Sequence, residues 1–528
     1  MIRINQIKLP IGHSKKQLVD KIRKILKIRD GIEVEYEIFK KSLDARKKPE
    51  LFYVYSVNVY TKDDNRILSK IKNSSVMSVK EKKYQFPDCG ELSLRNRPVI
   101  VGAGPAGLFC AYLLTEAGYN PLVIERGKPV EERQLDVENF WKTGVLDTSS
   151  NVQFGEGGAG TFSDGKLNTA VKDPVGRNRF VLETFVRFGA PDNILYDNKP
   201  HIGTDILSDV IINMRKYLIE HGCEFMFETC LTDIIIEDNR VKQIVCGNQN
   251  LEADSVVLAL GHSSRDTFVR LNEIKLDMQV KSFAVGFRVE HPQKMIDEYM
   301  YGDSNIKLPA SAYKVTSNFP NGRGVYSFCM CPGGFVVNSS SEENRTVVNG
   351  MSYSGRSGAN ANSAIIVSVT PDDFGADDAL AGMRYQMMLE EKNYNLGNGK
   401  IPQQLFGDFC NNTESKSYGE FDSNTKGATC FANLRGLMSN DMEESFILGM
   451  QHFGHIVPGF DRKDAILSGM ETRTSSPIRI LRDENFESNI EGVYPCGEGA
   501  GYAGGITSAA MDGMKVAEAI IKKYKPNL

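Results

Sequence analysis

Three glycines near residue 100 have the spacing of a dinucleotide-binding turn. Gly102, Gly104 and Gly107 form G-x-G-x-x-G directly after a short apolar run, and Pro105 and Ala106 open a helical pattern. In such a turn the first glycine permits a tight bend, the second lets the backbone approach a pyrophosphate, and the third lets helix and strand pack closely. The helix N-terminus then offers free amides to the phosphates. We therefore expect all five residues to border a dinucleotide.

An acid follows at the place where the adenosine ribose would lie. Glu125 closes the next predicted strand, 23 residues after Gly102, and its carboxylate can accept hydrogen bonds from ribose hydroxyls. Arg126 beside it would suit a 2′-phosphate, but Glu125 would repel that group. The ribose interpretation is favoured, and it serves NAD and FAD equally.

The C-terminal tail favours FAD. Gly497 and Glu498 follow a short strand, and Gly505 and Ile506 open a helix. This arrangement resembles FAD enzymes of the glutathione-reductase-like fold, in which an acid here binds the ribitol chain. Reduced flavin carries negative charge near N1 and O2, and a helix N-terminus stabilises such charge.

Two middle segments support the same cofactor. The segment 155–169 is too rich in glycine for a core element, so the backbone at Gly157 and Gly158 is expected to approach the cofactor; a flexible surface loop is the alternative. Its polar side chains would lie near the flavin ring: Ser163, Asp164 and Lys166. The strand ending at Gly261 resembles the strand that ends in Ala-Thr-Gly in such flavoproteins, with leucine in place of threonine.

Candidates for chemistry at the ring are fewer. Lys166 and Arg473 are candidates to balance an anionic substrate or flavin, with a solvated or backbone-bonded role as the alternative. His262 follows Gly261 at the end of a strand, where doubly wound folds place ligands, and is a candidate proton donor or a structural histidine. Cys331, two residues after Cys329 on one face of a predicted strand, is either half of a redox pair or a packed thiol.

No metal site is expected. The ten cysteines are scattered apart from Cys329 and Cys331, and their spacing matches neither a zinc nor an iron-sulfur site. His452 and His455 lie three residues apart on a predicted helix, but no carboxylate at metal-binding spacing joins them.

Several quoted segments carry a family resemblance. GHSSRDTF, EHPQ, FCMCPGG and ETRTSSP, together with the Gly-Glu tail, resemble the family of uncharacterised bacterial FAD-dependent dehydrogenases across most of the chain. The resemblance implies a flavin-dependent oxidoreductase with a small N-terminal domain and a dedicated C-terminal FAD-dependent domain. It implies no particular substrate.

The elements that position these residues indicate an α/β and α+β protein in three parts. Residues 1–90 read as a ferredoxin-like βαββαβ domain. A discontinuous Rossmann-like FAD-binding domain would comprise residues 98–266 and 461–528, and a mixed substrate domain residues 267–460.

Charge separates the first part from the rest. Residues 1–97 hold 23 Lys and Arg against 12 Asp and Glu, a net +11, which leaves 40 against 55, a net −15, for the remainder. We expect the basic domain to dock on its own acidic flavin domain through exposed charge pairs; nucleic-acid binding through residues 1–90 is the alternative. No apolar run is long enough for a membrane helix and no signal peptide is visible, which predicts a cytoplasmic protein and no membrane partner.

The function expected from these residues is hydride transfer between flavin N5 and a small-molecule substrate. No dedicated NAD(P)-binding domain is expected, so NAD(P)H would serve only as a transiently bound reductant. The alternatives are a flavin monooxygenase, and a nucleic-acid-binding or tethering protein in which FAD is a structural or sensing ligand. The sequence gives no oligomeric state.

Overall fold

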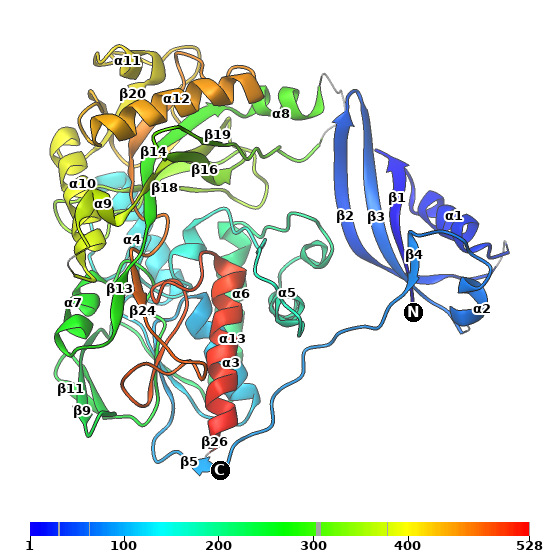
Figure 1. Cartoon of the computed structure of the whole chain (residues 1–528), viewed down its shortest axis with the longest axis horizontal. Coiled ribbons are helices and arrows are strands. Elements are labelled where there is room, and N and C mark those ends of the chain that lie inside the picture. Colours follow the sequence, from blue (N-terminus) through cyan, green and yellow to red (C-terminus); the bar gives the residue numbers. More distant parts are fainter. Residues whose placement is uncertain (30–31, 63, 303–307, 377, 527–528) are drawn as a thin grey trace.

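The computed structural model describes residues 1–29, 32–62, 64–302, 308–376 and 378–526. A large body holds residues from about 92 onward, and a small N-terminal module lies beside it, at the right of Figure 1. An extended linker runs back from the module to the base of the body.

The module has the βαββαβ element order that the sequence predicts. Its four strands lie in the order β2-β3-β1-β4, with all neighbours antiparallel. The apolar face of α1, with Leu18 and Ile22, packs on the sheet and forms a separate core with Ile2 and Val57. The elements are β1 (Ile2–Pro10), α1 (Lys15–Leu26), β2 (Glu35–Lys47), β3 (Glu50–Tyr60), α2 (Asp64–Leu68) and β4 (Val76–Ser78).

The body contains a parallel five-stranded sheet of short strands in the order β25-β12-β6-β7-β8, fully buried except for the edge strand β8. These strands are β6 (Val99–Val101), β7 (Leu122–Ile124), β8 (Glu224–Met226), β12 (Val256–Leu258) and β25 (Val493–Pro495). Strands buried on both faces are apolar throughout, as parallel sheets require. The C-terminal strand β25 pairs with β12, so the tail completes the sheet, as the Rossmann-like prediction requires.

Helices and a small antiparallel sheet cover the parallel sheet. Two helices, α3 (Pro105–Glu116) and α13 (Ile506–Lys523), lie against each other at the centre of the body in Figure 1. They pack closely because Gly513 has no side chain: a Cβ there would lie 2.0 Å from the carbonyl oxygen of Ala106. The other elements are α4 (Val130–Thr143), η1 (Ala159–Phe162), α5 (Arg177–Arg187), η2 (Asp192–Leu195), α6 (Thr204–Glu220), β9 (Leu231–Glu237), β10 (Arg240–Cys246), β11 (Gln249–Glu252) and α7 (Arg265–Glu273).

A seven-stranded sheet, ordered β15-β16-β19-β14-β23-β20-β22, forms the upper part of the body. Its strands are β14 (Phe283–Pro292), β15 (Thr316–Asn318), β16 (Gly324–Cys331), β19 (Asn360–Val369), β20 (Ile401–Leu405), β22 (Thr429–Phe431) and β23 (Ile466–Glu471). The small sheet β18-β17-β21 lies beside it, formed by β17 (Phe335–Asn338), β18 (Val348–Met351) and β21 (Thr425–Lys426). The helices of this part are α8 (Gln293–Tyr301), α9 (Pro371–Phe374), α10 (Ala381–Gly397), α11 (Phe406–Cys410) and α12 (Asn440–Ile456).

One predicted domain boundary is displaced. Strand β23 lies between β14 and β20 inside the seven-stranded sheet, so the mixed domain continues past residue 460. The antiparallel pair β13 (Met278–Val280) and β24 (Ile478–Ile480) marks where the chain leaves and re-enters the FAD-binding part. The prediction failed because the residues of β23 do not show which sheet the strand joins, and only its pairing with β14 and β20 decides this.

The linker is anchored to the base of the body. Its Tyr84 hydroxyl donates to Glu518 at 2.9 Å, and β5 (Leu92–Ser93) pairs with β26 (Tyr524–Lys525). The end of the linker is therefore part of the body's structure.

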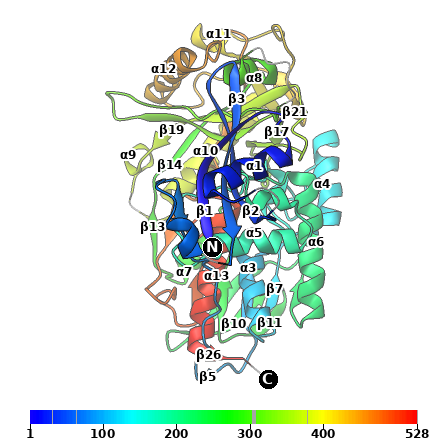
Figure 2. The same ribbon diagram turned by 90° about the vertical axis from the view of Figure 1, so that its right-hand side faces the viewer.

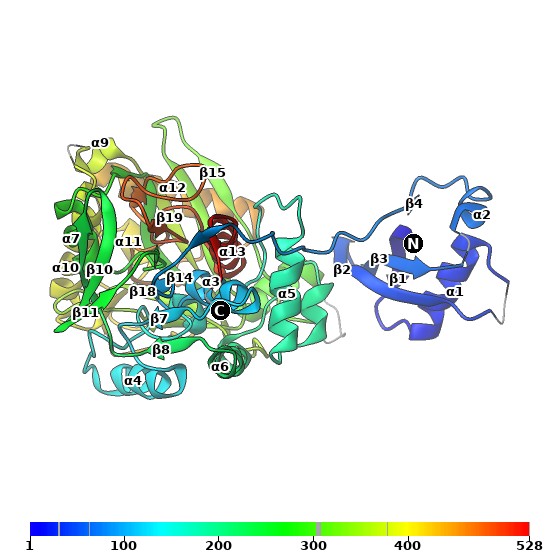
Figure 3. The same ribbon diagram turned by 90° about the horizontal axis from the view of Figure 1, so that it is seen from below.

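The module contacts the body through β2 and the β2–β3 turn (Figures 2 and 3). The amide of Lys41 donates to the Tyr196 carbonyl at 2.7 Å, and the amide of Asn198 donates to the Lys41 carbonyl at 2.8 Å. The ammonium of Lys48 lies 4.7 Å from the ring centroid of Tyr299. Among the described residues, no ion pair joins residues 1–90 to the body. The expected docking through exposed charge pairs is therefore wrong: an edge strand makes the contact through its backbone.

Candidate active site

One cavity of about 840 Å³ extends from the parallel sheet to the seven-stranded sheet. Its walls include Gly104 and Glu125 from the first part and Cys329, Asn349 and Arg356 from the second. The cavity therefore lies between the two parts of the body, where ligand sites commonly occur.

The glycine turn forms one end of this cavity. Gly102 has φ +106°, and a Cβ there would lie 2.3 Å from the Ala259 carbonyl oxygen. A Cβ at Gly107 would lie 1.9 Å from the Gly102 carbonyl oxygen, so this glycine permits helix and strand to pack and does not border the cavity. Gly104, the N-cap of α3, has no side-chain cap, and a Cβ there would find its nearest atom 3.8 Å away. The open space over free helix amides matches the predicted pyrophosphate position.

The Glu125 carboxylate is fixed at the end of β7. One of its oxygens accepts from the Ala103 amide at 2.8 Å, and the other accepts from the amides of Gly127 and Gly155 at 2.9 Å each. The side chain borders the cavity, and Oε2, which accepts only one hydrogen bond, retains acceptor capacity for a ribose hydroxyl. The predicted role of Glu125 fits this geometry.

The guanidinium of Arg126 is already engaged. It donates to Asp266 at 2.8 Å and lies 4.4 Å from the ring centroid of Phe154, although the residue borders the cavity. This neutralised charge favours the ribose interpretation over a 2′-phosphate.

The glycine-rich segment 155–169 is a fixed part of the cavity wall and not a flexible surface loop. The fully buried Arg133 donates to five backbone carbonyls at its start and just before it, those of Asn151, Val152, Gly155, Glu156 and Gly158. Gly158 borders the cavity, as predicted. Gly157 does not: its amide donates to the Ala103 carbonyl at 2.8 Å and its Cα faces Thr161, so it supports the wall from behind.

The tail brings a second carboxylate to the cavity. Glu498, Gly505 and Ile506 border it, and α13 begins at Ile506. Gly497 does not border it; it has φ +74°, and a Cβ there would lie 2.8 Å from the Cβ of Ala106. Glu498 is thus placed by a close contact between two segments that are almost 400 residues apart.

His262 lies beside this carboxylate. Its Nδ1 is 3.4 Å from Oε1 of Glu498, and its buried Nε2 has no hydrogen-bond partner among the described residues. Gly261 before it has φ +69°, and a Cβ there would meet nothing within 4 Å. Both residues border the cavity, so the strand end lies where the sequence placed it.

The shape and donor set of the cavity fit FAD. Backbone without side chains borders it at Gly104, Gly158 and Gly261, and fixed carboxylates stand at Glu125 and Glu498. An extended dinucleotide with a pyrophosphate, a ribose and a ribitol chain requires these groups in this order. FAD would thus be held by the backbone of three segments and by two carboxylates.

Lys166 borders the cavity where the first part meets the second. Its ammonium is 3.0 Å from Asp164 and donates to the Met330 carbonyl. Arg356 donates to the same aspartate from the other domain, at 2.9 Å through Nε. Burial opposes ionisation of Asp164, but Lys166 and Arg356 together hold its pKa below the ordinary range.

The two cysteines do not share a strand face. A bulge shifts the β16–β19 register between Phe328 and Cys331, and Cys329 has φ +41°. Cys329 is therefore exposed and Cys331 is buried, although both border the cavity. Guanidinium Nη2 of Arg288 lies 3.2 Å from Sγ of Cys331, and its Nη1 is 2.8 Å from Glu471. Burial raises the pKa of the Cys331 thiol, against the effects of Lys166 and Arg288.

Arg473 is not available to balance a ligand charge. Its guanidinium forms hydrogen bonds of 2.9 and 2.7 Å to Glu390, which also binds Arg265. Burial disfavours the charged form of Glu390, but the two guanidiniums hold its pKa below the ordinary range. The expected ligand role of Arg473 is replaced by a buried ion-pair network that joins α7, α10 and β23.

Sequence reasoning missed five charged residues around the far end of the cavity: Lys199, Arg288, Lys314, Arg356 and Glu471. They come from separate strands and loops, so no local spacing joins them. Glu471 is contained in the quoted segment ETRTSSP, which was the one available signal.

The described residues contain no group of three or more His, Cys, Asp and Glu side chains arranged for a metal ion, and no described helix has the length and apolarity to span a membrane. His452 and His455 lie on α12, away from the cavity residues.

Comparison with family models gives three matches. Residues 282–474 match the FAD-dependent protein, C-terminal domain-like family, residues 100–130 an NAD(P)-binding Rossmann-like domain, and residues 1–60 a domain of unknown function. The first range is the part of the chain between β13 and β24, and it includes β23.

Among individual proteins, an uncharacterized protein of Clostridium beijerinckii is 44% identical over 529 residues, covering 99% of both chains. A thiamine thiazole synthase of Aeropyrum pernix is 26% identical over 186 residues, 32% of this chain and 56% of that protein. Among solved structures, L-proline dehydrogenase from P. horikoshii covers 82% of this chain and 94% of its own at 14% identity and a TM-score of 0.35, which says nothing about substrate.

The full-length relative and the matched C-terminal domain agree with the motif resemblance. The chain belongs to the family of bacterial FAD-dependent proteins that share this C-terminal domain, and its cofactor is FAD.

Proposed function

We propose that this chain is an FAD-dependent oxidoreductase that transfers hydride between the flavin and a small molecule. FAD supplies the hydride-accepting and hydride-donating atom, N5. One observation carries the proposal: the cofactor cradle opens, within a single cavity, onto polar side chains of the second domain. A purely structural FAD would need no such chamber beside it.

The protein's own residues would bind, orient and exchange protons. The Glu498 carboxylate faces His262 Nδ1 at 3.4 Å, which favours a proton on that nitrogen and leaves Nε2 as the free one. Glu471 borders the substrate end, and burial raises the pKa of its carboxyl despite the opposing charge of Arg288. We assign His262 and Glu471 as the candidate proton-exchanging groups.

The test is an anaerobic one. NADH, NADPH and then a panel of metabolites are added to the purified yellow protein while the flavin spectrum is followed. Bleaching of the oxidised flavin bands by a compound from the panel would support the proposal and identify the substrate class. A flavin that dithionite reduces but no metabolite or nicotinamide reduces would contradict it.

A monooxygenase is the nearest rival, because the described residues form no second parallel sheet of the kind that a dedicated nicotinamide domain needs. Rapid reoxidation of the reduced protein through a hydroperoxide spectrum would favour it. NAD(P)H as a transient reductant stays a proposal. Nucleic-acid binding by residues 1–90 stays an untested alternative, and filter binding of RNA to the protein across a salt series tests it.

A further inference from the structure

The far end of the cavity carries more positive charge than its neighbours neutralise. Lys166, Lys199, Lys314 and Arg356 border it, against the two carboxylates of Asp164 and Glu471. Glu471 is paired with Arg288 at 2.8 Å, so its charge is already balanced. Asp164 alone serves both Lys166 and Arg356. The chamber therefore has an excess of three positive charges.

Two of these cations are free to bind. Lys199 and Lys314 are exposed, and neither forms an ion pair or hydrogen bond through its ammonium within the described part of the chain. In contrast, Arg126 and Arg473 at the cofactor end are each paired with a carboxylate. The unpaired charge is thus confined to the end where a substrate would lie.

Lys199 is held in place from two sides. The preceding residues Tyr196 and Asn198 share backbone hydrogen bonds with Lys41 of the N-terminal module. On the other side, the Leu167 amide donates to the Pro200 carbonyl at 3.0 Å. The backbone on either side of Lys199 is therefore fixed, by the module and by the flavin wall, so only its side chain must be ordered when an anion binds.

Lys314 stands on the opposite domain. Its neighbours Tyr313 and Val315 are buried, the Tyr313 hydroxyl lies 2.7 Å from Ser363, and the Val315 amide donates to Ser327 at 3.0 Å. Cations from both domains thus face one chamber, an arrangement suited to a ligand with two negative charges.

We infer that the substrate is a small organic dianion, carrying carboxylate or phosphate groups, bound by Lys199 and Lys314. This inference rests on the proposed function, because it names the substrate class of the same site. A dianion would pair with two ammonium groups that no described side chain neutralises, whereas a neutral or cationic molecule would gain no such pairing.

The test is binding to the oxidised FAD-loaded protein, without any electron transfer. Glutarate, methyl phosphate and the neutral glutaramide are titrated at constant ionic strength, with calorimetry and the flavin difference spectrum as readouts. Glutarate or methyl phosphate is expected to bind at least tenfold more tightly than glutaramide, and the stronger of the two identifies the anionic group. Equal binding of all three, or no binding, would overturn the inference.

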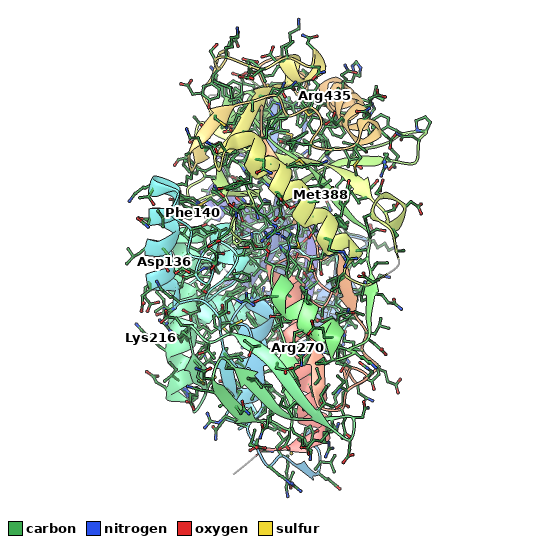
Figure 4. All side chains as sticks on the ribbon, turned by 90° about the vertical axis from the view of Figure 1, so that its left-hand side faces the viewer. Asp136, Phe140, Lys216, Arg270, Met388 and Arg435 are labelled. Carbon is green, nitrogen blue, oxygen red and sulfur yellow. The ribbon has the colours of Figure 1, made fainter. Side chains whose placement is uncertain are left out.

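Variants locate the site. Lys199→Gln and Lys314→Gln are each expected to weaken dianion binding at least tenfold, while the flavin spectrum and FAD content stay unchanged. Lys216→Gln is the matched control, because Lys216 lies on α6 on the outer face of the body (Figure 4). Equal loss in all three variants would show non-specific charge attraction and overturn the inference.

The two proposals fail in different ways. If dianions bind but no compound reduces the flavin, the anion site is supported and the proposal of an oxidoreductase is refuted. If a neutral metabolite reduces the flavin and no dianion binds, the proposal of an oxidoreductase is supported and the anion site is refuted.

Discussion

Replacing Gly104 with valine separates cofactor binding from folding. Gly104 has φ −75° and ψ −177°, which any L-residue adopts, and the nearest atom to a new Cβ is the Cα of Gly158 at 3.8 Å. The side chain would point into the open space over the first amides of α3. The variant is therefore expected to fold and to lose FAD.

The expected loss of folding stability is smaller than the expected loss of FAD affinity. Valine is a poorer N-cap residue than glycine, which costs about 1 kcal/mol of unfolding free energy. In the cofactor site, two amide-to-phosphate hydrogen bonds would be lost at about 1.5–3 kcal/mol each. The sum, about 3–6 kcal/mol, corresponds to a dissociation constant for FAD raised by about 10²- to 10⁴-fold.

Gly107→Ala is the matched control, because it is expected to destabilise the fold without placing a side chain in the cavity. Its Cβ would lie 1.9 Å from the Gly102 carbonyl oxygen and 3.3 Å from Ile100, so helix and strand must separate. Overpacking of this kind costs about 1–3 kcal/mol or more, in the protein without cofactor.

The assay has two parts: urea unfolding of each protein after FAD removal, and FAD titration followed by quenching of flavin fluorescence. A Gly104→Val protein that binds FAD within threefold of the wild-type dissociation constant would refute the placement of the pyrophosphate. A Gly104→Val protein destabilised as much as Gly107→Ala would refute the claim that the space at Gly104 is open.

Four further changes test other parts of the structure. Glu498→Ala should weaken FAD ten- to a hundredfold, for loss of about 1.5–3 kcal/mol, and an unchanged dissociation constant would exclude a ribitol contact. Cys331→Ser should leave both half-reactions intact in stopped-flow experiments; selective loss of the oxidative half-reaction would instead establish a thiol relay. Glu390→Gln should cost about 3–5 kcal/mol in urea unfolding at pH 7, because two buried guanidiniums lose their partner. The pKa of Glu390 is lowered in the folded protein, so the stability it contributes is present above its unfolded pKa of about 4.3 and is lost as the pH falls through the folded pKa. The gap between variant and wild type should therefore narrow in acid, and a gap that widens would contradict the ionised state. A chain truncated to begin at Lys80 should retain one FAD but bind dianions more weakly in calorimetry. The expected cause is that the backbone beside Lys199 loses its hydrogen bonds to Lys41. Undiminished dianion binding would show that the module does not position Lys199.

This truncation begins at Lys80 so that the end of the linker, near Leu94, is kept. In the structure Leu94 is buried in the core of the body, and β5 just before it pairs with β26. The sequence places the linker correctly by its proline and glycine residues, but composition carries no record of which linker residues pair with a distant strand.

The sequence alone determined the cofactor cradle, because its chemistry is local. The turn at Gly102, the acid at Glu125 and the strand-glycine-helix tail around Glu498 each need a fixed order of residues over a short stretch, and the structure brings them to one cavity. Local hydrophobic periodicity likewise predicted the βαββαβ module.

Tertiary structure alone decided which charges are free. In the sequence, Arg473 and Lys166 are simply two cationic residues. In the structure, Glu390 neutralises Arg473, whereas Lys166 shares Asp164 with Arg356 from the other domain. The membership of β23 in the seven-stranded sheet was equally hidden, since the residues of one strand do not show which strands it pairs with. Charge pairing and strand pairing depend on contacts between segments hundreds of residues apart, and the sequence order of a single chain does not contain those distances.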